Sequence, residues 1–343
     1  FISSVTGTFL VRSGILNSVH TFANDPSRGL YILIFLSLMI LFSFIIFFKR
    51  RINDQFNLNP ISKETFILSN NWFMMFYLAT VFVGTIYPIY TQVLYNINIS
   101  VGPPFYNQVI APILIPFLIF MALGPKIGWM KSKFISYKPF FVIIILSLLI
   151  NFFISYFLKS YNLISNLIVV SSLFLILHSL RDFITNVKSN SYLNLASFFS
   201  HLGFGILIFF IILNHNFSEE FDLNIKVGET KKIKNMEIKF NNLKIENREN
   251  YNAVIGDFNI QDFQKNHIKK LNPEIRVYEN PQTLTFESAI NTNLKQDIYL
   301  TMSNIDGSDF YNIKFQVKPF MLWIWLAAFL TASGGLVRVF LKK

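Results

Sequence analysis

The sequence predicts an all-α polytopic membrane bundle of about seven transmembrane helices, with a small extracytoplasmic β domain inserted before the last helix. The chain has 343 residues, of which 52% are hydrophobic and 14% charged, whereas about a quarter of the residues in a soluble domain are charged. Its 40 Phe residues are too many to be hidden in one water-soluble core. One polar segment, residues 215–317, interrupts the apolar pattern and predicts the inserted domain.

Seven windows of the sequence are long and apolar enough to cross a membrane. A transmembrane helix needs about 20 mainly apolar residues, because lipid offers the backbone no hydrogen-bond partners and a helix satisfies them internally. The seven windows are residues 30–48, 71–93, 108–123, 139–158, 163–180, 196–213 and 320–340. Residues 1–12 are expected to be the end of an earlier span, since Phe1 opens inside an apolar run without a starting Met and indicates a longer polypeptide.

The Lys and Arg residues between these windows predict the orientation of the bundle. Outside the polar segment there are 17 basic residues, and 13 of them lie in alternate loops or in the C-terminal tail. Loops of this kind stay on the cytoplasmic or matrix side of a membrane. The opposite side then holds residues 13–29, 94–107, the short turn around Lys159 and residues 215–317. The formal net charge of +11 is therefore a signal of topology and argues against a nucleic-acid-binding surface.

The polar segment carries 13 basic and 15 acidic residues and reads as a β domain. Short alternating runs separated by Asn, Gly and Pro predict strands of a small sheet or barrel; they are MEIKFNNLKIE, NAVIGDFNI, EIRVYE, DIYLTMS and NIKFQV. The expected organisation has three parts. Residues 1–214 form the bundle with an extracytoplasmic loop at 13–29, residues 215–317 the β domain, and residues 318–343 the last helix with a cytoplasmic or matrix tail.

Motifs for common catalytic chemistry are absent from the sequence. It has no Cys, which excludes disulfides, thiolate metal sites and a Cys nucleophile. It also lacks the motifs G-x-x-x-x-G-K-[ST], G-x-S-x-G and H-E-x-x-H, so nucleotide hydrolysis, serine hydrolysis and zinc proteolysis have no support. No residue is assigned a catalytic role, and any metal chemistry must use His, Met or carboxylates.

His201 is the strongest candidate ligand among the five histidines. It lies inside a predicted span, where a charged imidazole is costly, so the neutral ring is available to bind a metal or haem iron. Gly203 and Gly205 remove side-chain bulk nearby and leave room for a flat macrocycle or for another helix. The residue types alone favour the plainer alternative, a histidine hydrogen-bonded to a neighbouring span beside glycines that pack helix against helix.

His20 is the second candidate and lies in the extracytoplasmic loop. Arg12 and Arg28 bracket it and break the charge bias of that face, so they are expected to meet an anionic group such as a propionate. The alternative is a solvated loop with an ordinary surface histidine. His178 lies near the inner end of the fifth predicted span beside Arg181 and Asp182, and is interpreted as a side chain that reaches the membrane interface.

Several stretches of the sequence together resemble one family, the cytochrome c-type biogenesis proteins CcmF, which are haem lyase subunits. The resemblance runs along the whole chain and corresponds to about the C-terminal half of the family. The stretches are GTFLVRSGILNSVHTFANDPSRGLYIL at 7–33, GTIYP at 84–88, SVGPPFYN at 100–107, SHLGFGI at 200–206, KPFMLWIW at 318–325 and LTASGGLV at 330–337.

The resemblance implies that two histidines are axial ligands of haem iron. His20 would be one of two extracytoplasmic histidines that flank a Trp-rich haem-handling surface, with Arg12 and Arg28 near the propionates. His201 would be one of two membrane histidines that ligate haem b. The Trp-rich segment and the second histidine of each pair would lie upstream of Phe1.

The resemblance also implies a function and partners. A haem chaperone would supply haem, which is joined by thioether bonds to the C-x-x-C-H motif of apocytochrome c, and the chain would be a subunit of cytochrome c haem lyase (holocytochrome c synthetase). Its partners would be that chaperone, apocytochrome c, the lipid bilayer and other lyase subunits, including the polypeptide with the Trp-rich motif. Its place would be the bacterial inner membrane with the β domain in the periplasm, or the mitochondrial inner membrane. The alternatives are a related subunit for multihaem nitrite reductase, a multipass transporter, or a scaffold for the β domain.

Overall fold

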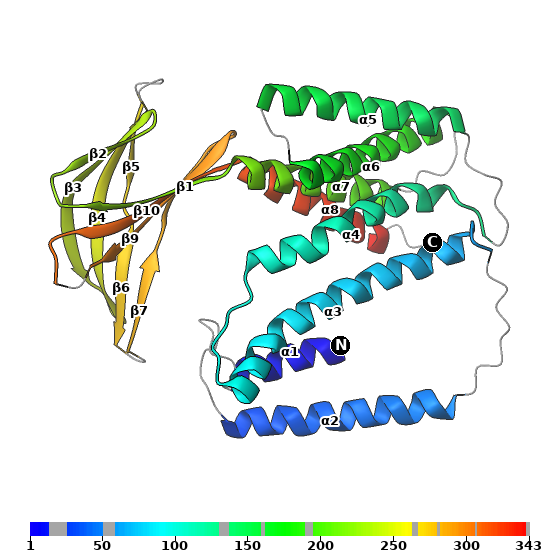
Figure 1. Cartoon of the computed structure of the whole chain (residues 1–343), viewed down its shortest axis with the longest axis horizontal. Helices are drawn as coiled ribbons and strands as arrows, with labels where there is room; N and C mark the ends of the chain where they lie inside the picture. The colour runs from blue at the N-terminus through cyan, green and yellow to red at the C-terminus, as the bar shows by residue number, and fades with distance from the viewer. Residues whose placement is uncertain are drawn as a thin grey trace. The chain divides into compact units, whose positions relative to one another are not determined.

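The structure is a computed structural model that describes residues 1–13, 26–50, 59–129, 137–158, 162–188, 195–262, 267–279, 282–305 and 307–340. Within these ranges the chain forms eight α-helices, a short 3₁₀ helix and ten β-strands (Figure 1). It divides into two compact units. The first is Phe1–Ile113 with Lys126–Phe134, and the second is Leu114–Pro125 with Ile135–Lys343.

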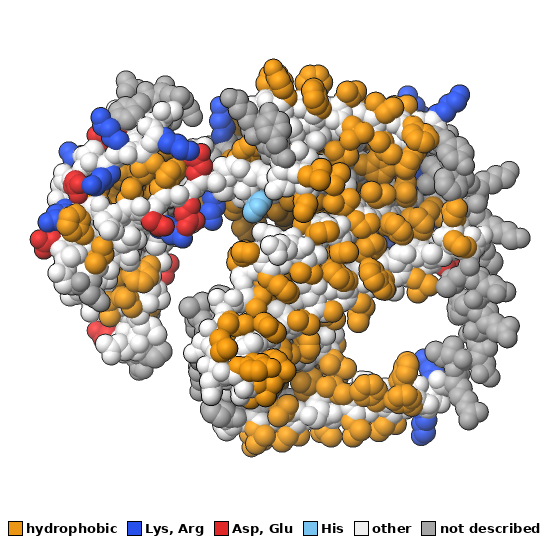
Figure 2. Space-filling view, viewed as in Figure 1, with side chains coloured by type: hydrophobic (Ala, Val, Ile, Leu, Met, Phe, Trp, Pro, Cys, Tyr) orange, Lys and Arg blue, Asp and Glu red, His pale blue; other side chains and the backbone are white. Residues whose placement is uncertain are grey.

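Seven of the helices are long and apolar enough to cross a membrane, which confirms the predicted spans. Helix α1 (Ile2–Arg12) precedes them. The seven are α2 (Pro26–Lys49), α3 (Lys63–Tyr95), α4 (Pro103–Leu123), α5 (Tyr137–Leu158), α6 (Leu163–Lys188), α7 (Leu195–Phe217) and α8 (Met321–Phe340). The chain is a multipass membrane protein. Its helices carry mostly hydrophobic side chains, whereas Lys, Arg, Asp and Glu gather on the strands (Figure 2).

Helix α3 begins earlier than its apolar pattern predicts. The predicted window opens at residue 71, but the helix begins at Lys63. The hydroxyl of Ser62 accepts a hydrogen bond from the backbone N–H of Thr65 at 3.3 Å and so satisfies one of the free N–H groups at the helix start. Glu64 in the first turn adds a favourable charge at the positive end of the helix dipole. A polar cap therefore extends the helix beyond its membrane-spanning part.

Within the second unit, α6 is the most covered helix. Just over half of its apolar window (56%) is buried, and it packs against both α5 and α7. Small residues let helix backbones approach closely. A buried Ser hydroxyl in such a contact can donate its hydrogen bond to a carbonyl of its own helix. Ser171 and Ser179 do so, to the carbonyls of Leu167 and Leu175, each at 2.8 Å.

The β domain between α7 and α8 consists of two antiparallel sheets that face each other. One sheet has the strand order β1-β10-β9-β8 and the other β2-β3-β4-β6-β7, with β5 paired to β4. The strands are β1 (Glu219–Ile225), β2 (Thr230–Ile233), β3 (Met236–Asn247), β4 (Tyr251–Asp262), β5 (His267–Leu271), β6 (Glu274–Glu279), β7 (Gln282–Glu287), β8 (Ala289–Thr292), β9 (Gln296–Asn304) and β10 (Tyr311–Pro319). All five segments predicted as strands form strands.

A dry core holds the two sheets together. Phe240 and Phe258 stack with ring centroids 4.1 Å apart, and Phe315 of the other sheet is fully buried in the same cluster. The domain is a β sandwich of two sheets, whereas the sequence pattern predicted a small sheet or barrel. Sequence alternation locates strands, but it does not say which strands pair.

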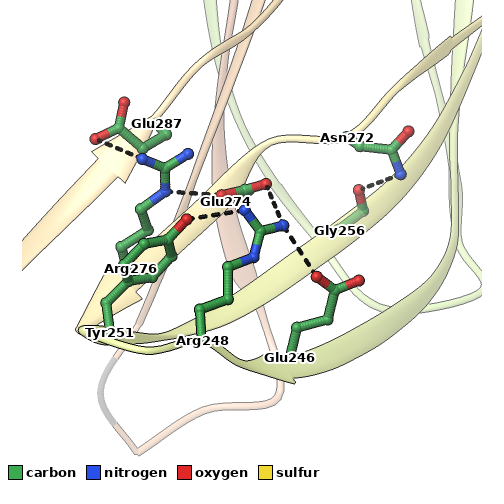
Figure 3. Close-up of polar contacts among 8 residues, drawn as sticks. All are labelled: Glu246, Arg248, Tyr251, Gly256, Asn272, Glu274, Arg276 and Glu287. Atoms are coloured by element: carbon green, nitrogen blue, oxygen red, sulfur yellow. Dashed lines mark hydrogen bonds and ion pairs between the residues drawn. The ribbon is translucent and has the colours of Figure 1, made fainter. Parts of the chain in front are cut away.

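The outer surface of the sheet formed by β3, β4, β6 and β7 carries a polar network (Figure 3). Arg276 donates to Glu274 at 2.7 Å, and this hydrogen bond raises the pKa of its guanidinium. Arg248 donates to Glu246 at 2.9 Å and to the hydroxyl of Tyr251 at 2.8 Å. Both guanidinium groups lie near the Tyr251 ring, at 5.6 Å and 4.9 Å from its centre. The network joins acids and bases in pairs and leaves no excess positive charge for a polyanion.

Two hydrogen bonds attach the sandwich to the transmembrane helices. The side-chain amide of Asn214, near the end of α7, donates to the carbonyl of Pro319 at 2.6 Å. The indole N–H of Trp323, in the first turn of α8, donates to the carbonyl of Leu294 between β8 and β9 at 2.9 Å. Phe210 stacks on Trp323 with ring centroids 5.8 Å apart. The domain is thus fixed to the ends of the two helices between which it is inserted.

Candidate functional site

His201 lies in the second turn of α7 and is half buried. Its imidazole makes no hydrogen bond within the described part of the chain, although neighbouring polar side chains of the bundle bond to backbone carbonyls. This differs from the plainer alternative, in which a neighbouring span would satisfy the ring. An imidazole nitrogen in an apolar span needs either a hydrogen-bond partner or a metal, because burial of an unsatisfied polar atom is costly. The ring therefore suits an axial ligand of haem iron.

The two glycines beside His201 serve helix packing. A Cβ atom at Gly203 would come 2.6 Å from the backbone nitrogen of Thr331 in α8. A Cβ atom at Gly205 would come 2.8 Å from Cγ1 of Ile176 in α6. Neither distance is possible between non-bonded atoms, so neither position accepts a Cβ atom unless the neighbouring helix moves. The space at these glycines is filled by neighbouring helices, so they provide no cradle for a macrocycle, and only the imidazole itself fits a haem.

The outer candidate site is only partly within the described residues. His20 lies outside them. Arg12 is the last residue of α1, Arg28 lies in the first turn of α2, and both are exposed. A Cβ atom at Gly29 would come 2.9 Å from Cα of Ser13, so the chain segments on either side of residues 14–25 touch. Because each arginine is adjacent to one of these two contacting residues, the fold brings Arg12 and Arg28 to the same end of the α1–α2 pair.

Two arginines at one place form a suitable site for carboxylates. Each guanidinium carries five donors in a planar fork that matches a carboxylate, and it stays charged at any physiological pH. The sequence predicts that the pair brackets His20, and the contact of Ser13 with Gly29 brings the two ends of that bracket together. Among the described residues there is no group of three or more His, Asp or Glu side chains that would hold a bare metal ion.

His178 lies elsewhere than the sequence interpretation placed it. Its side chain is 0% exposed and packs against Phe174, with ring centroids 4.3 Å apart, and against Phe140 of α5 at 6.4 Å. The prediction of an interfacial side chain was wrong, because α5 covers this face of α6. The many serines of the span were the available signal, since small residues mark helices that are packed on several sides.

Comparison with known proteins finds matches to both the helices and the sandwich. A family model described as the CcmF C-terminal beta-sandwich matches residues 216–319. The whole chain is 32% identical to the cytochrome c-type biogenesis protein CcmF of Haemophilus influenzae, and covers 55% of it. Over 99% of the chain it is 27% identical to CcmF of Escherichia coli and 26% identical to NrfE of Haemophilus influenzae, and it covers 54% of each.

The fold also matches a solved structure. The chain is similar to the structure of the cytochrome c haem lyase CcmF with a TM-score of 0.70 and 18% identity, over 98% of this chain and 52% of that one. At this identity the match shows a shared fold. The chain spans about half the length of the curated relatives that it matches.

Proposed function

Because this chain corresponds to the C-terminal half of the cytochrome c-type biogenesis protein CcmF, we propose that it is a haem-handling membrane subunit in cytochrome c maturation. The observation that carries the proposal is the 32% identity with a CcmF protein along the entire chain, through both helices and sandwich. The state of His201, a half-buried membrane imidazole without a hydrogen bond in the described residues, supports it further.

In this proposal His201 holds the iron of haem b inside the membrane. That haem, when bound, supplies a one-electron carrier that helps keep substrate haem iron reduced. The chain's own contribution is a neutral imidazole whose orientation is fixed by α7, which Gly203 and Gly205 lock against α8 and α6. Since those glycines leave no free space, the macrocycle would meet α7 at the imidazole and not at the glycine positions.

At the outer surface, His20 binds the iron of substrate haem while Arg12 and Arg28 bind its propionates. The substrate comes from a haem chaperone and is joined to apocytochrome c. Each thiol of the C-x-x-C-H motif adds its sulfur and its hydrogen across a vinyl double bond of the haem, so no atom is lost. The chain needs no Cys for this reaction, because the reacting thiols belong to apocytochrome c.

In this proposal the β domain lies in the periplasm of a bacterium, or on the outer side of the mitochondrial inner membrane. The partners are the haem chaperone, apocytochrome c and the lyase polypeptide that carries the Trp-rich motif. A role in the assembly of multihaem nitrite reductase is the second candidate, favoured by the 26% identity with NrfE. A multipass transporter is less well supported, since it would use ionisable groups deep in the membrane and the described spans carry few.

The test is the absorption spectrum of the chain purified together with the polypeptide that supplies the upstream half. His201→Ala should remove the spectrum of bis-histidine haem b. His215→Ala on the same helix is the control, since the exposed His215 lies 14 residues away, about 21 Å along the helix axis. An unchanged spectrum in His201→Ala would exclude the membrane ligand. The outer site is tested separately, because His20→Ala should abolish capture of haem-loaded chaperone while the spectrum remains.

A further inference from the structure

The turn between β8 and β9 carries an exposed leucine next to a membrane-spanning helix. Leu294 lies in this turn and is 69% exposed. Its carbonyl accepts the hydrogen bond from the indole N–H of Trp323 at 2.9 Å. The carbonyl of the next residue, Lys295, accepts a hydrogen bond from the backbone N–H of Phe320, also at 2.9 Å. The turn is therefore bound at two successive residues to the start of α8.

The length of α8 determines how deep this turn lies. The helix has 20 residues, and at 1.5 Å per residue it is about 30 Å long. The hydrocarbon core of a bilayer is about equally thick, so α8 has no spare turn outside it and its first turn lies at the hydrocarbon boundary. Trp323 belongs to that first turn. Because Leu294 is hydrogen-bonded to Trp323, it lies at the same level.

The backbone of the turn suits surroundings that lack water. The N–H groups of Lys295 and Gln296 both donate to the side-chain oxygen of Asn293, at 2.8 Å and 3.0 Å. The N–H of Asn293 donates to the carbonyl of Gln296 at 3.2 Å. Together with the two bonds to the start of α8, these contacts satisfy backbone groups that a surface turn often leaves to solvent. Hydrocarbon offers no replacement partner, so a turn at this depth requires such pairing.

We propose that the β8–β9 turn, residues 293–296, is a membrane contact, with the Leu294 side chain inserted among the acyl chains of the leaflet next to the sandwich. An exposed leucine gains free energy by leaving water, and lipid is the apolar medium at its level. The adjacent Lys295 is exposed and extends its ammonium group to the lipid phosphates, as lysines at membrane boundaries do. Lipid thus holds the sandwich in addition to its two chain connections.

The apolar surface of α8 continues to this turn. Trp325 and Phe329 lie one helical turn apart and are 66% and 72% exposed, so the half of α8 next to the sandwich presents an apolar stripe. Tryptophan at the end of such a stripe is typical of the membrane boundary. The proposal depends on α8 crossing the membrane and not on haem handling. It can therefore fail while the His201 spectrum behaves as proposed, and the reverse is also possible.

The direct test is the depth of a spin label at position 294. Because the chain has no Cys, Leu294→Cys gives a single site for a nitroxide label in the full chain. The labelled chain is reconstituted in phosphatidylcholine nanodiscs. Power saturation of the electron paramagnetic resonance signal then compares the accessibility of the label to oxygen, which concentrates in hydrocarbon, with its accessibility to a nickel chelate, which stays in water.

Two further positions calibrate the measurement. Leu284→Cys is the matched control, since Leu284 is also an exposed leucine (51%) but lies in β7 of the other sheet. Phe329→Cys, near the middle of α8, gives the value for hydrocarbon. We expect the oxygen-to-nickel ratio at position 294 to be several-fold above that at position 284. Equal ratios at positions 294 and 284 would put the turn in water and overturn the proposal. Low accessibility to both reagents would put Leu294 against protein and overturn it as well.

A second measurement tests the same contact in the assembled subunits. The chain with Leu294→p-benzoylphenylalanine is expressed together with the polypeptide that supplies the upstream half, in cells grown on radioactive phosphate. We expect an ultraviolet-dependent radioactive adduct that phospholipase C removes, in several-fold excess over Leu284→p-benzoylphenylalanine. An adduct to a polypeptide in its place would show that protein covers Leu294, and equal lipid adducts from both positions would show that the turn is not a specific contact. Either result overturns the proposal.

Discussion

Gly334 of α8 lies so close to Ala196 of α7 that a Cβ atom on the glycine would come 2.7 Å from the Ala196 carbonyl oxygen. Gly203 of α7 makes the reciprocal approach to Thr331 of α8. The two helices are separated in sequence by the whole β domain, yet they pack along a seam of small residues. This seam holds together the two helices between which the sandwich is inserted. It also fixes the position of α7, which carries His201.

The seam predicts different outcomes for two adjacent glycines. Gly334→Ala should destabilise the bundle by about 1–3 kcal/mol, because the new methyl group has no space and the helices must separate. Gly335→Ala should be neutral or slightly stabilising, since nothing lies within 4 Å of a Cβ atom there and Ala favours helix more than Gly. Thermal unfolding of the two variants in detergent distinguishes them. Equal unfolding temperatures would show that α7 and α8 are not packed at Gly334.

Much of the fold could be predicted because lipid imposes simple requirements on a sequence. Each span must be a long apolar helix, and each of the seven was found from length and hydropathy. The start of α3 was missed because Ser62 and Glu64, polar residues outside the apolar window, set it. The pairing of β1 with β10 was also beyond prediction. It joins segments about 90 residues apart, and strand alternation contains no information on such distant partners.

The sequence singles out candidate site residues only where charge or residue type is unusual. Arg12 and Arg28 stand out because they are basic residues on the side that the charge pattern predicts to be poor in them. The contact between Ser13 and Gly29, which brings these arginines together, depends on how two helices pack. The roles of Gly203 and Gly205 likewise had two interpretations in the sequence, and only the positions of α8 and α6 decide between them.

The junction between sandwich and membrane gives a prediction for two tryptophans. Trp323→Phe should remove the hydrogen bond to the Leu294 carbonyl and cost about 1 kcal/mol locally. Amide hydrogen exchange in residues 293–300 should become faster as a result. Trp325→Phe is the matched control, since Trp325 is 66% exposed and donates no hydrogen bond to the described residues. If both variants exchange alike, the Trp323 bond does not hold the β8–β9 connection.

An ion pair on the sandwich surface predicts a pH-dependent difference in stability. Lys314 of β10 donates to Glu220 of β1, and this hydrogen bond lowers the pKa of the Glu220 carboxyl. The same bond raises the pKa of the Lys314 ammonium. The contribution from Glu220 is thus present above about pH 4.5 and is lost as the pH falls through the lower pKa of the folded state. That from Lys314 is present below about pH 10.5 and is lost as the pH rises through its higher folded pKa.

Lys314→Met should therefore destabilise the sandwich near pH 7, and the difference from wild type should shrink toward pH 2.5. Both side chains are nearly half exposed, so the expected loss is at most about 1 kcal/mol. Urea unfolding at the two pH values measures it. Lys244→Met is the control, because Lys244 is exposed and forms no ion pair with the described residues. A difference that persists unchanged at pH 2.5 would assign the effect to packing of the Lys314 stem.

The arginines of the outer site predict a specific dependence on the propionates of haem. Arg12→Gln with Arg28→Gln should weaken capture of haem by the assembled subunits about tenfold, because two charge-assisted contacts to carboxylates are lost. Capture is measured as haem transferred from loaded chaperone at a fixed ionic strength. The difference in capture between wild type and the double variant should decrease as salt is added, since exposed charges are screened beyond about 10 Å at 0.1 M.

The decisive comparison uses haem whose propionates are esterified. Esterified haem has no carboxylate for a guanidinium to bind, so wild type and the double variant should capture it equally. Arg338→Gln removes one positive charge from the last turn of α8 and should leave capture of ordinary haem unchanged. If the double variant also lost affinity for the ester, the arginines would act by stabilising the conformation of residues 13–29 and not by binding propionates. A direct carboxylate contact requires that the double variant capture less ordinary haem and that this loss decrease with added salt. It also requires that neither effect occur with the ester.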